Sequence, residues 1–445
     1  MISDFKYIKL LLSVQYFVYF GTRGIALPYF NLFCHHLGFS GFEIGILSSV
    51  QTAAVVIFPV LWAMAADRFN VRKSIFIICT VMSTFLWSLL FLTKEFLPIL
   101  FILVIYSVFY APIIAFLEAF AMDILGREKK KYGKSRVWGT ISFIGVSLVL
   151  GKLLSVYSTD IIVPLILAGM VIQSFFALKM PEDRKRESKS EDSKPVKSSS
   201  KSQSSSESLS STESASLPES SSSSEVSTNK GQDFKAFFSL NTSLFLVAGF
   251  LMLASHGVYY GFFSIYLESL GFGTGFIGFA WALASIAEIA VMVNSGVIFS
   301  RFNLKTVLII SCLAACLRWI LLFVTSDASP FIPDASIITN TTAPAIAPLF
   351  NTTLSIVILF SQLLHAFTYA SFHIASILAI DALSPKGTTF GQAVNNAVTY
   401  GAGIMAGFLL GGVFYDTFQG YTFLASSVAA LAGGIILLYI KFDSH

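Results

Sequence analysis

The sequence predicts an all-α polytopic membrane protein, with twelve transmembrane helices in two six-helix bundles and both termini in the cytoplasm. Hydrophobic residues make up 55% of the chain and charged residues 12%, and the mean hydropathy is +0.75. This composition lies far from that of an average soluble domain. Apolar runs recur along the chain, and the basic residues gather in alternate loops. We therefore expect an integral protein of a cell membrane, plasma or inner, surrounded by the lipid bilayer.

Apolar runs of about 20 residues, long enough to cross a bilayer, divide into two sets of six. The first set is expected near residues 7–33, 42–66, 74–93, 97–124, 136–156 and 161–179. The second set is expected near residues 240–267, 274–299, 305–326, 354–383, 391–414 and 421–440. The first run is too long for the apolar core of a signal peptide, so we interpret it as a retained span.

The basic residues predict the orientation of these helices. One face carries nearly all of them: Lys6, Lys9, Arg68, Arg72, Lys73, the run Arg127 to Lys134, the central loop, Arg301, Lys305, Lys386 and Lys441. The loops on the opposite face carry almost none beyond Lys94. Because basic loops stay in the cytoplasm, both termini are predicted to be cytoplasmic.

A polar stretch separates the two sets of helices. Residues 181–236 are rich in Ser, Lys and Glu, and such a segment cannot bury enough apolar surface to fold. We therefore divide the chain into an N-terminal bundle (1–180), a disordered cytoplasmic linker (181–236) and a C-terminal bundle (237–445). The long outward loop 327–353 holds two sequons, at Asn340 and Asn351, whose use depends on the host cell.

An internal repeat supports the division into two halves. Arg-Phe-Asn occurs at 68–70 after the second predicted helix and again at 301–303 after the eighth. Asp123, followed after eight residues by Tyr132-Gly133, is echoed by Asp381, followed after eight by Phe390-Gly391. Each half resembles the other, as in transporters built from two related bundles around a site at the membrane midplane.

Several motifs resemble a known family. The hairpin Asp67-Arg68-x3-Arg72-Lys73 resembles the signature that follows the second helix in the major facilitator superfamily, although Ala63 and Asn70 stand where that signature prefers glycine. The segments 132–139 (YGKSRVWG) and 254–261 (ASHGVYYG), together with Glu288, Arg318-Trp319 and Leu364-His365, resemble the phenylpropionate permease-like branch. Lactose permease-like proton symporters are a more distant likeness, through Glu118-Ala-Phe120 and the Glu118 to Arg136 spacing.

The resemblance implies a proton-coupled symporter that works by alternating access. In the lactose permease pattern, an acid and an arginine corresponding to Glu118 and Arg136 hold the substrate. In the same pattern, substrate binding is coupled to protons by an acid on the eighth helix, an arginine on the ninth and a histidine on the tenth. The resemblance implies Glu288, Arg318 and either His365 or His373 for these positions. That pattern has a carboxylate one turn after the histidine, whereas Thr368 and Ser376 stand here. The proton-carrying group is therefore left open.

The polar residues within apolar spans indicate the same chemistry without the family. Ionisable groups in lipid are costly and usually mark a substrate or ion path. His365 and His373 lie on one helical stripe with Tyr369, and His256 lies on another with Tyr260. Histidine titrates near physiological pH, so these groups are candidate proton carriers. We predict proton coupling by five residues: His256, Glu288, Arg318, His365 and His373.

Three arginines within or at the ends of apolar spans indicate the substrate. Arg23, Arg136 and Arg318 offer guanidinium groups, which bind carboxylates in a bidentate manner. We predict a small carboxylate or aromatic acid as substrate, bound by six residues: Glu118, Arg136, Arg23, Tyr259, Tyr260 and Trp319. If the acids and arginines only neutralise each other, a neutral sugar or nucleoside held between Glu118 and Arg136 fits instead.

Glu118 and Arg136 flank a basic turn. Along one continuous helix they would be about 27 Å apart, so they can meet only if the chain reverses between them. The repeat has Ser376 and Val394 at the aligned positions, which makes this N-half pair the main substrate candidate. Six charged residues near the helix ends are expected to hold the cytoplasmic hairpins in place by ion pairs and not to bind substrate: Asp67, Arg68, Arg72, Asp123, Arg301 and Asp381.

Other classes of function find little support. The four cysteines lie in or beside apolar segments without the spacing of a zinc site or a disulfide framework. Glu128 replaces the first glycine of a P-loop, and no nucleophile elbow or metal motif occurs. We expect no catalytic residues, metal, cofactor or nucleic-acid partner, and a monomer whose ligands are a small molecule and protons. The alternative from another class is a non-transporting receptor or scaffold.

Overall fold

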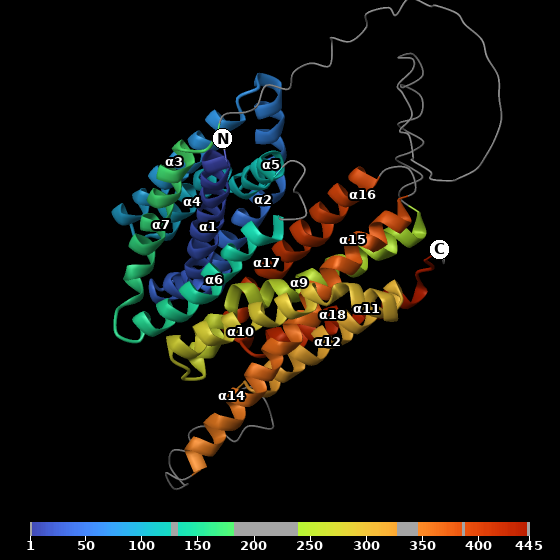
Figure 1. Ribbon diagram of the computed structural model, residues 1–445. Helices are drawn as coiled ribbons and strands as arrows, with labels where there is room; N and C mark the ends of the chain where they lie inside the picture. Colours follow the sequence, from blue (N-terminus) through green and yellow to red (C-terminus); the bar gives the residue numbers. More distant parts are fainter. Residues whose placement is uncertain (1, 126–131, 182–238, 327–345, 385–387, 443–445) are drawn as a thin grey trace, which may run out of the picture.

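The computed structural model describes residues 2–125, 132–181, 239–326, 346–384 and 388–442. Every regular element in these ranges is helical, and twelve helices are long and apolar enough to cross a membrane. The predicted all-α fold with twelve spans is confirmed, with the helices of each half packed together (Figure 1), and the cytoplasmic placement of the termini stays a prediction. The predicted linker 181–236 lies outside the described residues except for Pro181, and so does the sequon at Asn340, so the predicted domain boundaries stay predictions. The sequon at Asn351 begins within a helix, Ile346–His365, and not in the loop predicted at 327–353.

The first half contains six spans, and three of them are built from more than one element. Their elements are α1 (Ile2–His36), α2 (Gly41–Phe69), α3 (Arg72–Ser88) with η1 (Leu89–Leu92), α4 (Phe96–Tyr110) with α5 (Ile113–Leu125), α6 (Tyr132–Leu154), and η3 (Thr159–Ile161) with α7 (Ile162–Leu178). The span predicted as one helix at 97–124 is broken near Pro112. Proline has no N–H to donate and clashes with the preceding turn.

The second half also contains six spans, which follow the predicted positions closely. Its elements are α9 (Leu240–Ser269), α10 (Thr274–Val293) with α11 (Ser295–Arg301), α12 (Leu304–Val324), α14 (Ile346–His365) with η4 (Ala366–Ser371) and α15 (Phe372–Leu383), α16 (Thr388–Asn395) with η5 (Asn396–Gly403) and α17 (Ile404–Phe418), and α18 (Tyr421–Tyr439). Both η4 and η5 are π-helical. Such wide turns are rare and frequently occur at functional sites.

Polar residues fix the helix ends. Ser40 and Glu43 form a reciprocal capping box at the start of α2, which satisfies backbone N–H groups that the first turn leaves free. The same helix ends at Asn70, whose φ of 53° lies in the left-handed region. That region favours glycine, and asparagine is among the residues that tolerate it best. This explains how Asn70 replaces glycine in the predicted hairpin.

The two halves meet along α1, α2 and α6 on one side and α9, α10 and α17 on the other (Figure 1). Small residues allow the closest contacts: a Cβ added at Gly412 of α17 would lie 2.6 Å from the carbonyl oxygen of Gly41 of α2. The Asp416 carboxylate accepts a hydrogen bond from the Gly41 N–H at 2.8 Å. These contacts seal the end of the molecule opposite to the basic hairpins.

Candidate functional site

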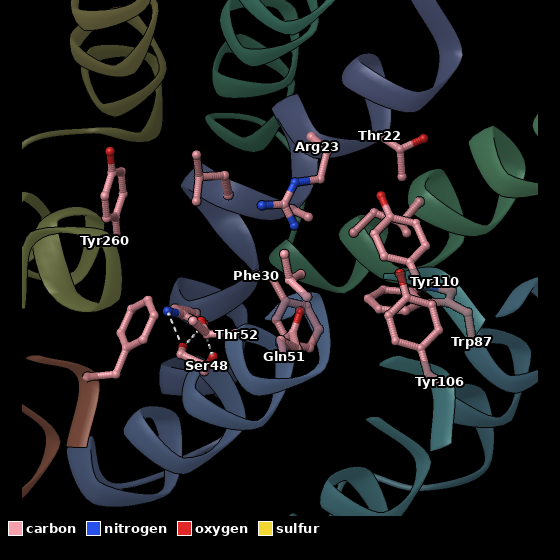
Figure 2. Close-up of a pocket in the computed structure, with 16 residues that line it drawn as sticks. Thr22, Arg23, Phe30, Ser48, Gln51, Thr52, Trp87, Tyr106, Tyr110 and Tyr260 are labelled. Carbon is pink, nitrogen blue, oxygen red and sulfur yellow. Dashed lines mark hydrogen bonds between the residues drawn. The ribbon is translucent and has the colours of Figure 1, made fainter. Parts of the chain in front are cut away.

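A cavity of about 120 Å³ lies between the two halves. Residues from α1, α2, α3, α4 and α7 line it on one side, and Tyr260 of α9 and Phe408 of α17 line it on the other. Arg23 of α1 points into this space, between Tyr110 and Tyr260 (Figure 2). Within the described part of the chain, Arg23 has no hydrogen bond and no ion pair. The cavity therefore contains a fixed positive charge that no described side chain neutralises by an ion pair.

Tyrosine rings form one wall of this space. The ring of Tyr110 stacks on Tyr106 with centroids 5.0 Å apart, and on Tyr19 with centroids 5.6 Å apart. All three tyrosines lie within electrostatic reach of the Arg23 guanidinium. Tyr106 and Tyr110 are one helical turn apart on α4, so they share a face. The wall offers flat apolar surface beside a cation.

The opposite wall carries neutral polar groups from α1 and α2. The Asn31 amide donates to the Ser48 hydroxyl at 3.1 Å and to the Gly261 carbonyl oxygen of the other half at 3.0 Å. Gln51 and Thr52 also line the cavity (Figure 2). These amides and hydroxyls can hydrogen-bond to a ligand without altering the net charge of the site.

A second cluster lies in the C-terminal half around Arg318 of α12, which is fully buried. Its guanidinium donates to His365 Nδ1 at 2.7 Å, to the Gln362 side-chain oxygen at 3.1 Å and to the Ser361 carbonyl oxygen at 3.0 Å. On the far side of the ring, His365 Nε2 lies 2.8 Å from Glu288 Oε1. Arg318, His365 and Glu288 thus form one continuous chain of charge-assisted contacts.

This geometry fixes the tautomer of His365. Because a guanidinium has only donors, the Nδ1 atom facing it must accept, and in the neutral ring the proton sits on Nε2. The Nε2–H group then donates to the Glu288 carboxylate. With Nδ1 occupied by Arg318, the Glu288 carboxylate is the member of this chain that has free acceptor sites for a proton. Its side chain is 22% exposed, whereas that of His365 is 5% exposed.

The other predicted residues of this half surround the same chain. The ring centroids of Tyr259 and Trp319 lie 4.0 Å and 4.6 Å from the Arg318 guanidinium carbon. Tyr259 donates to Gln362, whose oxygen also accepts from Arg318. Both Tyr259 and Trp319 are fully buried and lie away from the cavity that contains Arg23. Of the predicted aromatic residues, only Tyr260 lines that cavity.

His256 and His373 occupy different environments. His256 is fully buried; its Nδ1 donates to the Met252 carbonyl oxygen at 2.9 Å, and its Nε2 faces the Thr368 hydroxyl at 3.2 Å. His373 is half-buried, and its Nδ1 lies 2.9 Å from the Tyr400 hydroxyl in the π-helical segment η5. Both ring nitrogens of His256 therefore have hydrogen-bond partners, whereas His373 lies at the edge of the cluster.

The structure brings Glu118 and Arg136 near each other without joining them. Their charges lie within electrostatic reach, together with Tyr132, but they form no ion pair within 4.0 Å in the part of the chain that the structure describes. The Arg136 guanidinium instead lies 3.8 Å from the ring centroid of Phe20. Burial raises the pKa of Tyr132, which precedes the span, so its hydroxyl remains a donor. The substrate role of this pair stays a prediction.

The charged residues predicted to latch the hairpins are only partly connected. Arg72 forms ion pairs with Asp123 and, at 3.9 Å, with Asp67. Arg301 and Asp381 form no such pair with a described residue. Residues 126–131 and 385–387 lie outside the described ranges, so the predicted contacts that hold these hairpins are not tested.

Sequence analysis missed several residues of both clusters. Gln362 lies three residues before His365 on the same helical face, and an amide in an apolar span was a usable signal. The tyrosines at 106 and 110 had the spacing of one helical turn. The cavity residues Asn31, Ser48, Gln51 and Thr52 gave a weaker signal, because single neutral polar residues are common in long spans.

Comparison with known proteins identifies relatives over nearly the whole chain. The model of the MFS_1 like family matches residues 9–425. A curated relative of Escherichia coli (strain K12), named "Probable 3-phenylpropionic acid transporter", is 23% identical over 424 residues, which cover 94% of each chain. The uncharacterized transporter YwbF of Bacillus subtilis (strain 168) is 21% identical over 314 residues, which cover 69% of this chain and 68% of that one.

A solved structure has the same fold. The crystal structure of the nucleoside transporter NupG superposes with a TM-score of 0.73 at 18% sequence identity, and the match covers 98% of this chain and 100% of that chain. At this level of identity the likeness concerns the fold alone.

Proposed function

The chain belongs to the MFS_1 like family and is a multi-pass membrane transporter, and we propose that it is a proton-coupled symporter of a small organic carboxylate, with aromatic acids favoured, working by alternating access. The observation that carries this proposal is the Arg23 guanidinium, which lies in a cavity between the halves without a protein counter-ion among the described residues. A charge taken out of bulk water is costly unless it is paired. A carboxylate ligand would supply the missing partner.

The surroundings of Arg23 support an aromatic acid. The tyrosine column at 19, 106 and 110 offers flat apolar surface beside the guanidinium, so one ligand can use both a carboxylate and a ring. The relative named as a 3-phenylpropionic acid transporter is consistent with such a ligand. The relatives and structural neighbours named above are transporters, so the receptor or scaffold alternative has no support among them.

For the proton, we assign Glu288 as the carrier and Arg318 and His365 as its partners. His365 is held neutral in one tautomer by Arg318 and donates to the Glu288 carboxylate. Protonation of Glu288 removes the charge that this contact stabilises, so proton binding alters the contact between α10 and α14. Such a change, together with opening of the sealed end between α2 and α17, provides a route for alternating access.

A neutral nucleoside or sugar is the second candidate substrate. The amides and hydroxyls of Asn31, Ser48, Gln51 and Thr52 line the cavity and suit the hydroxyl groups of such a ligand. It would leave Arg23 without an anionic partner, and for this reason we favour the carboxylate.

Uptake into proteoliposomes tests the proposal. A proton gradient directed into the proteoliposomes should drive accumulation of radiolabelled 3-phenylpropionate. Excess benzoate should inhibit this uptake more strongly than excess uridine or lactose. Arg23→Gln should weaken apparent affinity roughly 10-fold to 150-fold, the range for a lost hydrogen bond to a charged group. Lys152→Gln, a charge removal at an exposed site on α6, is the matched control and should not change uptake. Strong competition by uridine with no effect of benzoate would overturn the carboxylate assignment.

A further inference from the structure

Tyr369 lies between the two clusters described above. On the tenth span, its ring stacks between His365, with centroids 5.6 Å apart, and His373, with centroids 6.3 Å apart and planes only 5° from parallel. It also packs edge-on against Tyr260, which lines the cavity of Arg23, with centroids 6.1 Å apart. Tyr369 therefore connects the wall of the cavity to the chain formed by Arg318, His365 and Glu288.

The Tyr369 hydroxyl has no hydrogen-bond partner in the described part of the chain, and the side chain is only partly buried. Two other tyrosines near the site have hydrogen-bond partners: Tyr259 donates to Gln362, and the Tyr400 hydroxyl contacts His373 and Ser376. A phenol group that is only partly buried and has no hydrogen-bond partner among the described residues is available to a ligand.

Two charged groups, one from each half of the molecule, lie in the surroundings of Tyr369. Arg23 of α1 and Glu288 of α10 both lie within electrostatic reach of Tyr369. Arg23 has no hydrogen bond or ion pair with a described residue, whereas Glu288 already contacts His365. The titratable groups around Tyr369 are Arg23 from the first half and, from the second half, Glu288 on α10, His256 and Tyr260 on α9, His365 and His373 on its own span, and Tyr400 on η5.

The segment that carries Tyr369 is itself unusual. Tyr369 lies within the π-helical turn η4, Ala366–Ser371, which packs against α10 and α12. A π-helical turn changes the angle between residues before and after it, and such turns frequently occur at functional sites. Here the wide turn places Tyr369 in the same stack as His365 while its edge reaches Tyr260.

From these contacts we propose that Tyr369 is a substrate-binding residue, whose hydroxyl donates to the same substrate carboxylate that the Arg23 guanidinium binds. The carboxylate has two oxygen atoms and can accept from both donors at once. One donor comes from each half, so the anion joins the halves when the cavity closes. The inference rests on the proposed function, because it assumes an anionic substrate at Arg23.

A clamp of this kind also links substrate to proton. A carboxylate bound at Tyr369 places a negative charge within reach of Glu288, and two neighbouring carboxylates are more stable when one of them is protonated. Anion binding and proton binding then favour each other, which is the thermodynamic requirement for symport. The residue thus contributes both affinity and coupling.

Binding of 3-phenylpropionate to the purified full-length protein, measured by isothermal titration calorimetry, tests the clamp. Tyr369→Phe keeps the ring and its stacking contacts and removes only the hydroxyl. We expect its Kd for 3-phenylpropionate to rise about 10-fold or more, while the Kd for the neutral 3-phenylpropanamide changes by less than about 3-fold. Tyr415→Phe, which alters a buried tyrosine stacked on Phe262 outside the cavity, is the matched control and should leave both values unchanged.

A double-mutant cycle identifies the shared partner. If Tyr369 and Arg23 hold one carboxylate, the combined loss in Tyr369→Phe with Arg23→Gln should be smaller than the product of the two single losses. Proton release or uptake on binding, measured in two buffers, should also decrease in Tyr369→Phe, which a purely structural role would not cause. If the wild-type protein binds 3-phenylpropionate and Tyr369→Phe binds it with the same Kd, the clamp is wrong but the proposed function stands. The same conclusion follows if the losses of affinity in the two single variants multiply fully in the double variant. Failure of the wild-type protein to bind 3-phenylpropionate would overturn the proposed function and the clamp together.

Discussion

At the scale of residues, the two arginines of the central region have opposite surroundings. Arg318 is fully buried, and its guanidinium is engaged by a histidine, an amide, a backbone oxygen and two aromatic rings. Arg23 faces a cavity with tyrosines around it and has no ion pair among the described residues. Arg318, whose guanidinium is occupied by protein partners, therefore organises the site, whereas the Arg23 guanidinium is available to a ligand.

Glu288→Gln should separate proton coupling from substrate movement. The amide mimics the protonated carboxyl, so exchange of substrate across the membrane should continue, whereas accumulation driven by a pH gradient should decrease roughly 5-fold to 150-fold, the usual range of a coupling free energy. Counterflow and gradient-driven uptake in the same proteoliposomes measure the two activities. Accumulation that still follows the pH gradient in this variant would show that another group carries the proton.

Sequence reasoning identified the charged residues of the cluster around Arg318 but not their contacts. Glu288, Arg318 and His365 could be named because charged residues in apolar spans are rare, and the structure brings these three together. The sequence could not choose between His365 and His373, because both lie on one stripe; the guanidinium contact distinguishes them. The emphasis on Glu118 and Arg136 illustrates the limit, since spacing shows only that two residues can meet. Their actual separation depends on how α5 and α6 pack.

At the scale of elements, breaks within the spans determine where side chains point. Apolar length alone predicts a span, but Pro112 divides the fourth one, and the π-helical turns η4 and η5 interrupt the tenth and eleventh. The proline was visible in the sequence. The π-helical turns were not, because they arise when neighbouring helices hold a side chain out of the regular register. The position of Tyr369 depends on such a turn and could not be derived from a 3.6-residue period.

The close contact of α2 with α17 should control opening of the sealed end. A Cβ at Gly412 would lie 2.6 Å from the Gly41 carbonyl oxygen, so Gly412→Val must separate these helices. We expect the distance between spin labels at His35→Cys and Ser269→Cys, on the two halves at this end, to become longer. It should not change in Gly145→Val, because a Cβ at Gly145 meets no atom within 4 Å. Equal distances in both variants would contradict the role of this contact as a seal.

At the scale of the whole molecule, contacts between the halves run from one end to the middle of the membrane spans, where Val56 of α2 meets Gly401 of η5, and the basic hairpin at Asp67–Lys73 lies at the other end. His36 of the first half contacts Glu268 of the second, with His36 Nε2 lying 2.8 Å from a Glu268 carboxylate oxygen, and Thr159 of the first half holds the other side of the ring, with its hydroxyl 2.9 Å from His36 Nδ1. Thr274 donates to the Gly151 carbonyl oxygen at 2.8 Å. With the predicted orientation, in which basic loops face the cytoplasm, the sealed end faces outward. The described arrangement then corresponds to one of the two states of an alternating-access cycle.

Removal of residues 185–230 should leave transport intact. The composition of this stretch is too polar to form a packed core, so the two bundles do not depend on it for their stability. We expect initial uptake rates per folded protein to stay within about 2-fold of wild type, since a linker changes effective concentration only weakly with its length. Fluorescence-detected size-exclusion chromatography provides the amount of folded protein. Loss of uptake in a correctly folded deletion variant would assign the stretch a direct role.

The central claim is that Arg23 binds the carboxylate of the substrate. The most direct test is the ratio of the Kd values for 3-phenylpropanamide and 3-phenylpropionate in the wild-type protein, in Arg23→Gln and in Arg136→Gln. We predict that the wild-type protein prefers the acid over the amide by about 10-fold or more, and that Arg23→Gln loses this preference while Arg136→Gln keeps most of it. An undiminished preference for the acid in Arg23→Gln, or its loss in Arg136→Gln alone, would contradict the claim.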